Sequence, residues 1–278
     1  GDRMSAGPQT PAPLAIGGPA GGRALPVAPR TALALTLASV VGFLAFTWPL
    51  VVAPSSGLAH GTDAPLVLGL VLASVLTVVL VALGEHGIDV KAIALLGLLS
   101  AVGAVLRPLS AGTAGIELVF VVIVLGGRVL GPGFGFALGS TTLFTSALLT
   151  GGVGPWLPFQ MLAASWVGLG AGLLPPARGR REIVLLAGYG ALASLGFGLA
   201  MNMSFWPFQL GAGTELSFVA GAPVGQNLHR FLLYSLATSL AWDIGRALTT
   251  AVGIWLVGRA VLVTLRRTAG RAGFGPPL

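Results

Sequence analysis

Long apolar runs separated by short polar gaps make up most of this sequence. The runs continue for about 15 to 35 residues, and crossing the hydrocarbon core of a bilayer takes about 20 apolar residues of helix. The pattern therefore predicts an all-α fold, a polytopic transmembrane helical bundle of about eight spans. The expected spans cover residues 31–52, 65–83, 92–106, 115–129, 134–149, 157–174, 183–203 and 231–265.

Composition supports lipid as the solvent of these runs. Of the 278 residues, 55% are hydrophobic and 8% are charged, whereas a soluble domain carries about 25% charged residues. The 43 glycines suit helices that pack closely in lipid. Because the sequence has no cysteine, disulfides, thiolate nucleophiles and cysteine-bound metals are excluded.

The positive charges fall in alternate gaps between the runs. If the N-terminal tail is cytoplasmic, ten Lys and Arg lie in inner gaps, and only Arg107 and Arg230 lie in outer gaps. Short loops rich in Lys and Arg stay in the cytoplasm, so we expect a multi-pass protein of the cell membrane with both termini cytoplasmic. The net charge of +7 does not indicate nucleic-acid binding, because the basic residues form no patch with interleaved aromatics. The inner basic residues are Arg23, Arg30, Lys91, Arg128, Arg178, Arg180, Arg181, Arg266, Arg267 and Arg271.

Four segments follow from this pattern. Residues 1–30 are rich in Gly, Pro and Ala and predict a disordered cytoplasmic tail. Residues 31–90 predict a transmembrane hairpin, residues 91–268 a six-helix membrane core, and residues 269–278 a cytoplasmic C-terminal tail. The first span resembles a signal peptide, but its apolar stretch of roughly 20 residues exceeds the usual h-region of about 7–15.

The last expected span is too long for a single crossing. Its roughly 35 residues would form a helix of about 50 Å, against a hydrocarbon core of about 30 Å. We expect it either to project beyond the membrane or to break near residues 242–245. Asp243 and Arg246 lie three residues apart there, on one helix face. They either neutralise each other or form a gate at the helix break.

Catalytic chemistry finds little support in the sequence. The three histidines are dispersed without metal-binding spacing, and only Glu117 and Asp243 among the carboxylates lie within or beside a span. The glycines of residues 133–139 resemble a phosphate loop only weakly, because no βαβ unit surrounds them. We therefore expect that the protein is not an enzyme and that it has no catalytic residues, no metal and no cofactor.

Polar and aromatic residues gather at the outward ends of the spans. Three such loops on one face predict a polar pocket that opens to the outside and binds a substrate. The tryptophans also fit an interfacial aromatic belt, and Arg107 also fits a contact with lipid phosphate. The candidate substrate-binding residues are Arg107, Glu117, Trp156, Gln160, Asn202, Trp206, Gln209, Asn227, His229 and Arg230.

Small residues recur at helical spacing in two spans, where they would let another helix approach closely. They serve either packing within the chain or docking onto a separate membrane partner. The candidate docking residues are Ala94, Gly97, Ala101 and Ala104, and the corresponding residues of the first span are Ala34, Ala38 and Gly42.

Several stretches resemble the substrate-binding (S) components of energy-coupling factor (ECF) transporters, in particular an actinobacterial branch. The resemblance covers about the last two-thirds of the chain. It rests on Val105-Leu106-Arg107-Pro108-Leu109, on Arg128 to Gly135, on Thr150 to Gln160, on Gly168 and Gly170, on Phe205-Trp206-Pro207-Phe208 and on Asn227 to Phe231.

This resemblance implies a fold of six helices with both ends cytoplasmic. It implies that the outer loops capture a vitamin, and that small residues of the first core helix dock on a coupling transmembrane subunit, which paired ATPases power. The extra N-terminal hairpin departs from the family. If the hairpin covers the third span, the docking role passes to Ala34, Ala38 and Gly42. The bulky rings of Trp206 and Phe208 suit a large ligand, and we expect cobalamin.

Two other functions remain open at this stage. One is an integral membrane enzyme that acts on lipid head groups, with Arg107, Glu117, His229 and Asp243 as its candidates. The other is a membrane assembly subunit, which would depend on its small-residue surface and not on its outer loops.

Overall fold

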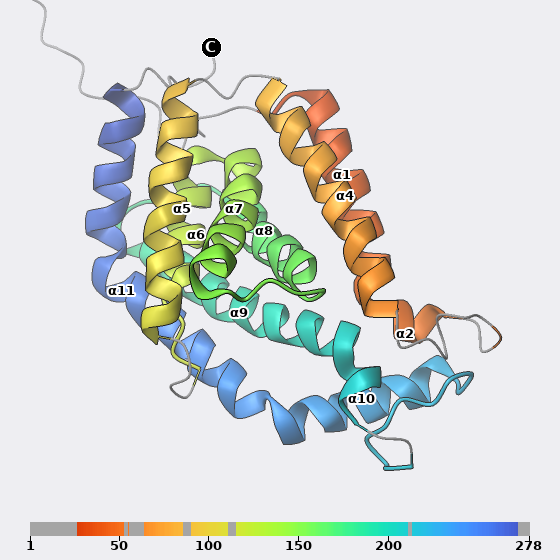
Figure 1. Cartoon of the computed structure of the whole chain (residues 1–278). Coiled ribbons are helices and arrows are strands. Elements are labelled where there is room, and N and C mark those ends of the chain that lie inside the picture. The colour runs from red at the N-terminus through yellow and green to blue at the C-terminus, as the bar shows by residue number, and fades with distance from the viewer. Residues whose placement is uncertain are drawn as a thin grey trace, which may run out of the picture.

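The computed structural model describes residues 27–52, 55, 64–85, 90–110, 115–210 and 213–271. All regular secondary structure in these ranges is helical, and the helices pack side by side (Figure 1), which confirms the all-α polytopic bundle. The predicted tail before residue 27 and the segment after Arg271 lie outside the described residues. The helices are α1 (Pro29–Phe46), α2 (Trp48–Val51), α4 (Ala64–Glu85), α5 (Val90–Ser110), α6 (Val119–Leu130), α7 (Pro132–Thr150), α8 (Leu157–Leu173), α9 (Gly179–Gln209), α10 (Val224–Thr238) and α11 (Leu240–Arg271).

Six of the described helices are long and apolar enough to cross a membrane. Helices α6 and α8 are also apolar but have only 12 and 17 residues. At 1.5 Å per residue α6 is about 18 Å long, which is less than a hydrocarbon core of about 30 Å. Ten residues of α6 are buried. The fourth and sixth predicted spans are therefore short helices, and α6 is enclosed by its neighbours.

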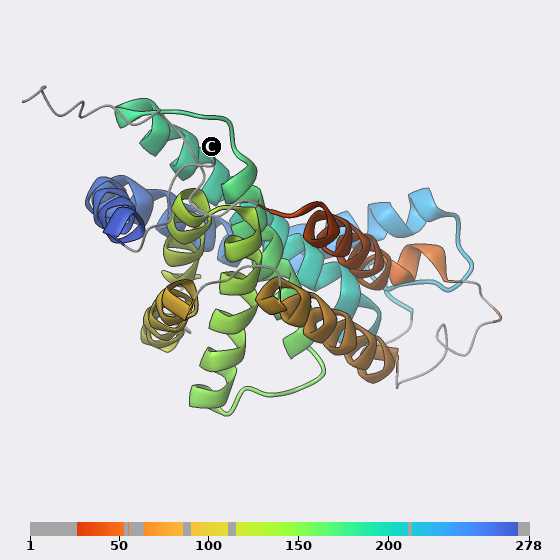
Figure 2. The ribbon, with the colours of Figure 1, turned by 90° about the horizontal axis from the view of Figure 1, so that it is seen from above.

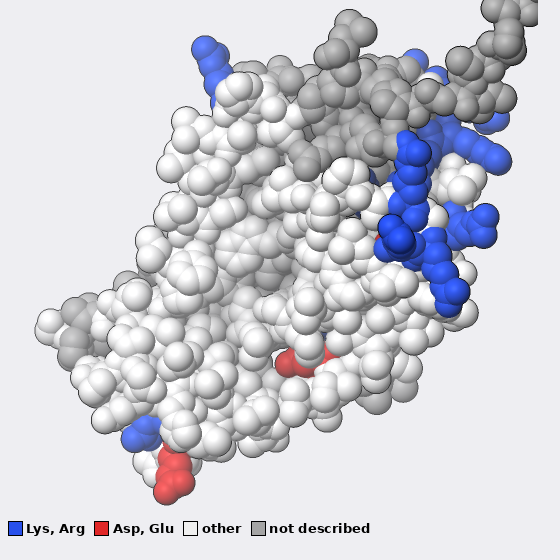
Figure 3. All heavy atoms as spheres, turned by 180° about the vertical axis from the view of Figure 1, so that it is seen from behind, with Lys and Arg blue, Asp and Glu red and all other residues white. Residues whose placement is uncertain are grey.

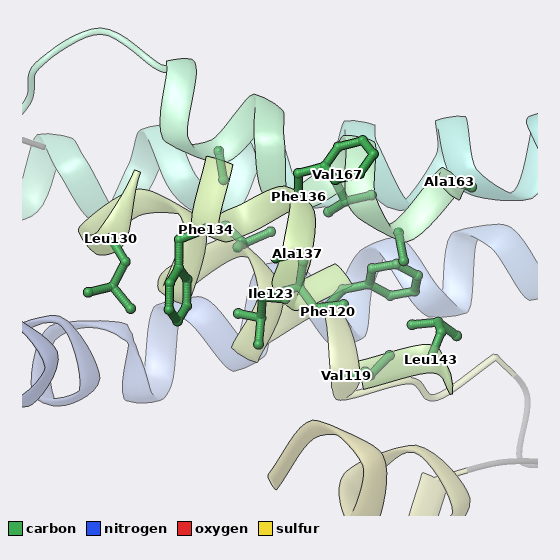
Figure 4. Close-up of a cluster of buried hydrophobic side chains, with 14 of the residues drawn as sticks. Val119, Phe120, Ile123, Leu130, Phe134, Phe136, Ala137, Leu143, Ala163 and Val167 are labelled. Atoms are coloured by element: carbon green, nitrogen blue, oxygen red, sulfur yellow. The ribbon is translucent and has the colours of Figure 1, made fainter. Parts of the chain in front are cut away.

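The core of the bundle lies where α6, α7 and α8 meet. Figure 4 shows buried side chains from these three helices gathered in one cluster. Phe120 of α6 is 1% exposed and Phe136 of α7 is 0% exposed. Lipid tails are as apolar as these side chains, so moving the side chains out of the lipid gains little free energy. Close packing between the helices therefore stabilises this cluster.

Helices α7 and α8 approach each other backbone to backbone. A Cβ atom added to Gly135 would overlap the carbonyl of Gly168, and a Cβ added to Gly168 would overlap the carbonyl of Gly135. The hydroxyls of Ser140 and Ser165 form a buried hydrogen bond of 2.6 Å across the same contact. The glycines in the stretch 133–139 therefore serve helix packing.

The N-terminal hairpin of α1 and α4 packs on α8. Ala38 is 3% exposed, and a Cβ atom added to Gly42 would overlap the side chain of Leu162. The indole Nε1 of Trp166 donates a hydrogen bond of 3.0 Å to the hydroxyl of Ser39. The small residues of the first span are thus used for packing within the chain.

The last predicted span is divided into α10 and α11. The break lies at Ser239, so the prediction of a break near residues 242–245 is wrong by a few residues, and α11 continues through them. The Ser239 hydroxyl donates to the carbonyl of Ser235 at 3.2 Å and accepts a hydrogen bond from the Asn202 side-chain amide at 2.5 Å. Serine side chains that bond to nearby backbone compete with regular helix.

The start of α1 and the end of α11 lie on the same side of the molecule (Figure 1). Seen from that side, the hairpin of α1 and α4 lies on one flank, and α5 and α11 lie on the other (Figure 2). Lys and Arg side chains gather near the end of α11 (Figure 3), and we call this region the basic end. Its arginines at the start of α9 and the end of α11 are Arg178, Arg180, Arg181, Arg266, Arg267 and Arg271.

Candidate functional site

A buried ion cluster joins the start of α11 to the segment before α6. The Arg246 guanidinium bonds Glu117 through Nε at 2.7 Å and Asp243 through Nη1 at 2.7 Å. It also lies 5.3 Å from the centre of the Phe197 ring in α9. Asp243 and Arg246 are 6% and 7% exposed. We call these three charged residues the Arg246 cluster, because its arginine bonds both carboxylates.

Two glycines make room for the Arg246 cluster. Gly115 has a positive φ of 78°, which residues with a side chain rarely adopt. A Cβ atom there would also overlap the backbone carbonyl of Trp242. On the other side, a Cβ atom on Gly198 of α9 would overlap the carboxylate of Asp243. Gly115 therefore allows the segment that carries Glu117 to approach α11, and Gly198 allows α11 to approach α9. Only glycine fits at either position.

Arg107, at the end of α5, extends this cluster toward α8. It lies near enough to Glu117 and Arg246 to interact electrostatically with both. Its Nη2 donates a hydrogen bond of 3.3 Å to the side-chain oxygen of Gln160. Two arginines and two carboxylates then balance in charge, as apolar surroundings require.

Asn202 lies half-buried on α9, where that helix meets the break between α10 and α11. Its amide donates to the hydroxyl of Ser239, one turn before Asp243. Trp156 is 43% exposed, and its indole donates to the carbonyl of Gly152 at 3.3 Å. Asn202 thus adjoins the Arg246 cluster along α11, whereas Trp156 lies on the turn between α7 and α8.

The other candidates lie where α9 ends and α10 begins. Trp206 is 0% exposed, and its indole donates to the carbonyl of Leu216 at 2.7 Å. Asn227 is 3% exposed, and its side-chain amide donates to the carbonyl of Val219 at 2.8 Å and accepts from the Val219 N–H at 3.2 Å. These two side chains shape the segment between the helices and do not face outward. Gln209 and His229 are exposed, and Arg230 is half-buried.

The candidate docking residues lie along α5. Ala94, Gly97 and Ala101 are exposed, and a Cβ atom added to Gly97 would meet nothing within 4 Å. Ala104 is 0% exposed and packs inside the bundle. The hairpin lies on the other flank (Figure 2) and leaves these three residues uncovered.

Sequence reasoning missed a second ion cluster, near the basic end. Glu182 is 2% exposed and accepts hydrogen bonds from Arg128 at 2.8 Å and from Arg266 at 2.7 Å. Arg128 also donates to the carbonyls of Leu174 and Pro175. This cluster ties α6, α9 and α11 together. A single acid beside a triple-arginine loop was the available signal.

No group of three or more His, Asp or Glu able to hold a metal ion occurs in the part of the chain that the structure describes. The potential ligands lie apart or are bonded to arginine. Glu117 and Asp243 both face the positive charge of Arg246, which disfavours a cation between them.

Comparison with known proteins identifies the family of this chain. Residues 91–257 match the family described as "ECF transporter, substrate-specific component". No curated protein and no solved structure matches the chain. The matched range contains the Arg246 cluster and the candidate docking residues of α5, and it excludes the hairpin of α1 and α4.

Proposed function

Because the chain belongs to the substrate-specific components of ECF transporters, we propose that it captures a solute at the end of the bundle opposite the basic end. The family is one of transporter components, and it implies coupling to ECF membrane and ATPase subunits. The chain is accordingly a membrane protein that binds a substrate for transport.

The proposed ligand site includes the polar groups around the Arg246 cluster. Arg107, Glu117 and Gln160 come from three separate segments and meet there. Glu117 keeps 18% of its side chain exposed, so the cluster is not fully closed. Asn202, Gln209, His229 and Arg230 extend the site toward α10, while Trp206 and Asn227 support it from within, and Trp156 borders it.

The proposed orientation places the basic end in the cytoplasm. Basic residues in short loops remain on that side of the membrane. Since α1 begins and α11 ends on this side, both termini would be cytoplasmic. The proposed ligand site would then open outward, as uptake requires.

The observation that best supports a coupling role is the uncovered stripe of Ala94, Gly97 and Ala101 on α5. Small residues on a lipid-facing helix allow a second helix to approach closely. The corresponding residues Ala38 and Gly42 of α1 are buried within the chain. We therefore assign docking on the ECF membrane subunit to α5.

The proposed substrate is a vitamin, and cobalamin is the first candidate. A large flat solute needs exposed aromatic surface, and Phe208 is 38% exposed beside the segment that joins α9 to α10. Trp206 is buried and supplies no such surface.

Substitution of Gly97 by Leu tests this function. The added side chain would hold the partner helix away, so the coupling subunit should no longer co-purify and uptake should fall to background. The purified variant should still bind the solute that the wild-type chain binds in a thermal-shift screen of cobalamin, riboflavin and thiamine.

Gly188→Leu is the matched control. Gly188 is also an exposed helical glycine with nothing within 4 Å of an added Cβ, but it lies on α9. Normal uptake by the Gly97 variant would remove the α5 docking assignment. No thermal shift of the wild-type chain with any of the three vitamins would contradict the proposed substrate class.

The enzyme alternative gains no support from the geometry. Glu117 and Asp243 are its candidate acids, and both are bonded to Arg246. His229 lies on α10 and is exposed. An assembly role without solute binding predicts the same loss of partner with Gly97→Leu, so the vitamin screen separates it from transport.

A further inference from the structure

The tip of the N-terminal hairpin carries a tryptophan that is buried against a distant part of the chain. Trp48 begins α2 and is 4% exposed. Its indole Nε1 donates a hydrogen bond of 3.1 Å to the carbonyl of Ser204 in α9. The hairpin lies outside the family match over residues 91–257, so this contact joins it to the matched core.

The same indole ring packs on two phenylalanines. It stacks on Phe208 of α9 at 5.6 Å between ring centres, and it lies 6.2 Å from Phe218 in a tilted arrangement. The ring of Trp206, on α9, contacts Phe218 edge-on at 5.7 Å between ring centres. Phe218 therefore contacts one tryptophan from the hairpin and one from α9.

Phe218 belongs to the segment 213–223 between α9 and α10, which we call the 213–223 loop. Some of its hydrogen bonds are local, since Ser217 bonds Thr214 and Ala222 bonds Val219. Such bonds shape turns but do not place the loop against the helices. The contacts of Phe218, together with the bonds from Trp206 and Asn227, do so.

We propose that the N-terminal hairpin holds the 213–223 loop in place for solute capture, with Trp48 as the positioning residue. The loop connects the end of α9, which carries Gln209, to α10, which carries His229 and Arg230. Displacement of the loop would change the spacing of these polar groups. The role in capture rests on the proposed function, whereas the placement of the loop does not.

Hydrogen exchange of the full chain in detergent tests the placement. Trp48→Ala removes both ring contacts and the bond to Ser204, so amide exchange in the 213–223 loop should accelerate about tenfold or more. Trp48→Phe keeps an aromatic ring and should accelerate it less. Exchange in α7 should stay unchanged in both variants.

Trp255→Ala is the control, because Trp255 is 50% exposed on α11 and contacts Arg180 near the basic end. This variant should leave exchange in the loop as it is. Unchanged loop exchange in Trp48→Ala would overturn the proposal. Equal acceleration in α7 would do the same, because it would indicate a general loss of stability.

A dissociation measurement tests the role in capture separately. The probe is whichever of cobalamin, riboflavin or thiamine the wild-type chain binds, and Trp48→Ala should release it faster while Trp255→Ala should not. Equal release rates would overturn the role in capture. If the wild-type chain binds none of the three, the proposed function and this role in capture fail together, and the exchange result still decides the placement of the loop.

Discussion

At the scale of single residues, the buried charges of this chain are held by specific partners. Spacing alone predicted the contact between Asp243 and Arg246, because residues three apart share a helix face. Glu117 is 129 residues from Arg246 in sequence, and no local pattern connects them. Sequence reasoning placed Glu117 and Arg107 in one loop region, but only the fold brought Arg246 to Glu117 and Gln160 to Arg107.

Arg246→Gln should destabilise the protein strongly. It leaves the buried Asp243 and the half-buried Glu117 without their arginine, and removal of one partner from a buried pair costs about 3–5 kcal/mol. Thermal unfolding in detergent should therefore show a much lower midpoint than for the wild-type chain.

The control for this change is Arg267→Gln, at an exposed position near the end of α11. Exposed substitutions usually change stability by less than about 0.5 kcal/mol. Equal midpoints for Arg246→Gln and Arg267→Gln would show that the Arg246 cluster contributes nothing to stability.

At the scale of helices, some glycines allow two helices to pack closely, while others lie on exposed surface. Gly135 and Gly168 allow α7 and α8 to touch through their backbones, whereas Gly188 and Gly97 face open space. Small-residue spacing identified surfaces that could pack closely, but it did not separate those used inside the chain from those left free.

Gly135→Ala and Gly188→Ala should therefore change stability in opposite directions. The first forces a Cβ atom into the carbonyl of Gly168, and overpacking of this kind costs about 1–3 kcal/mol. The second only improves helix propensity, by up to about 1 kcal/mol. Unfolding midpoints measured side by side check the two signs, and a stabilising Gly135→Ala would contradict the close approach of α7 and α8.

At the scale of the whole molecule, charge and topology agree. The described ends of the chain lie on one side, and the arginines at the start of α9 and the end of α11 form a basic end (Figure 3). The proposed ligand site lies at the α10 and α5–α6 end of the bundle, and the proposed docking stripe lies along α5. The proposed import direction depends on which compartment meets the basic end.

Single-cysteine labelling determines that compartment, and the chain has no cysteine of its own. Gln209 and Arg181 are both exposed and lie at the two ends of α9. A membrane-impermeant maleimide applied to intact cells should label Gln209→Cys and spare Arg181→Cys. Both should react after permeabilisation. The reverse labelling pattern in intact cells would show the opposite orientation in the membrane and would contradict the proposed uptake.

Much of the architecture was available before the structure. Run length predicted a helix for every expected span, because the cost of exposing backbone and charge to lipid acts on each segment separately. The same local rule gave the excess length of the last span. It did not give the position of the break, at Ser239, whose hydroxyl accepts a hydrogen bond from Asn202 of another helix. Nor did it show that Trp206 and Asn227 face inward. Both bond the backbone of the 213–223 loop, and that loop also contacts Trp48, which is distant in sequence.

The amino-acid sequence by itself therefore determined that this chain is a bundle of membrane helices resembling ECF substrate-specific components, because hydropathy, charge and motif are properties of local sequence. Only the tertiary structure decided which small-residue stripe stays open, which carboxylates Arg246 bonds, and that Trp48 of the hairpin reaches Ser204 across 156 residues of chain. These are choices among partners distant in sequence, and packing in three dimensions makes them.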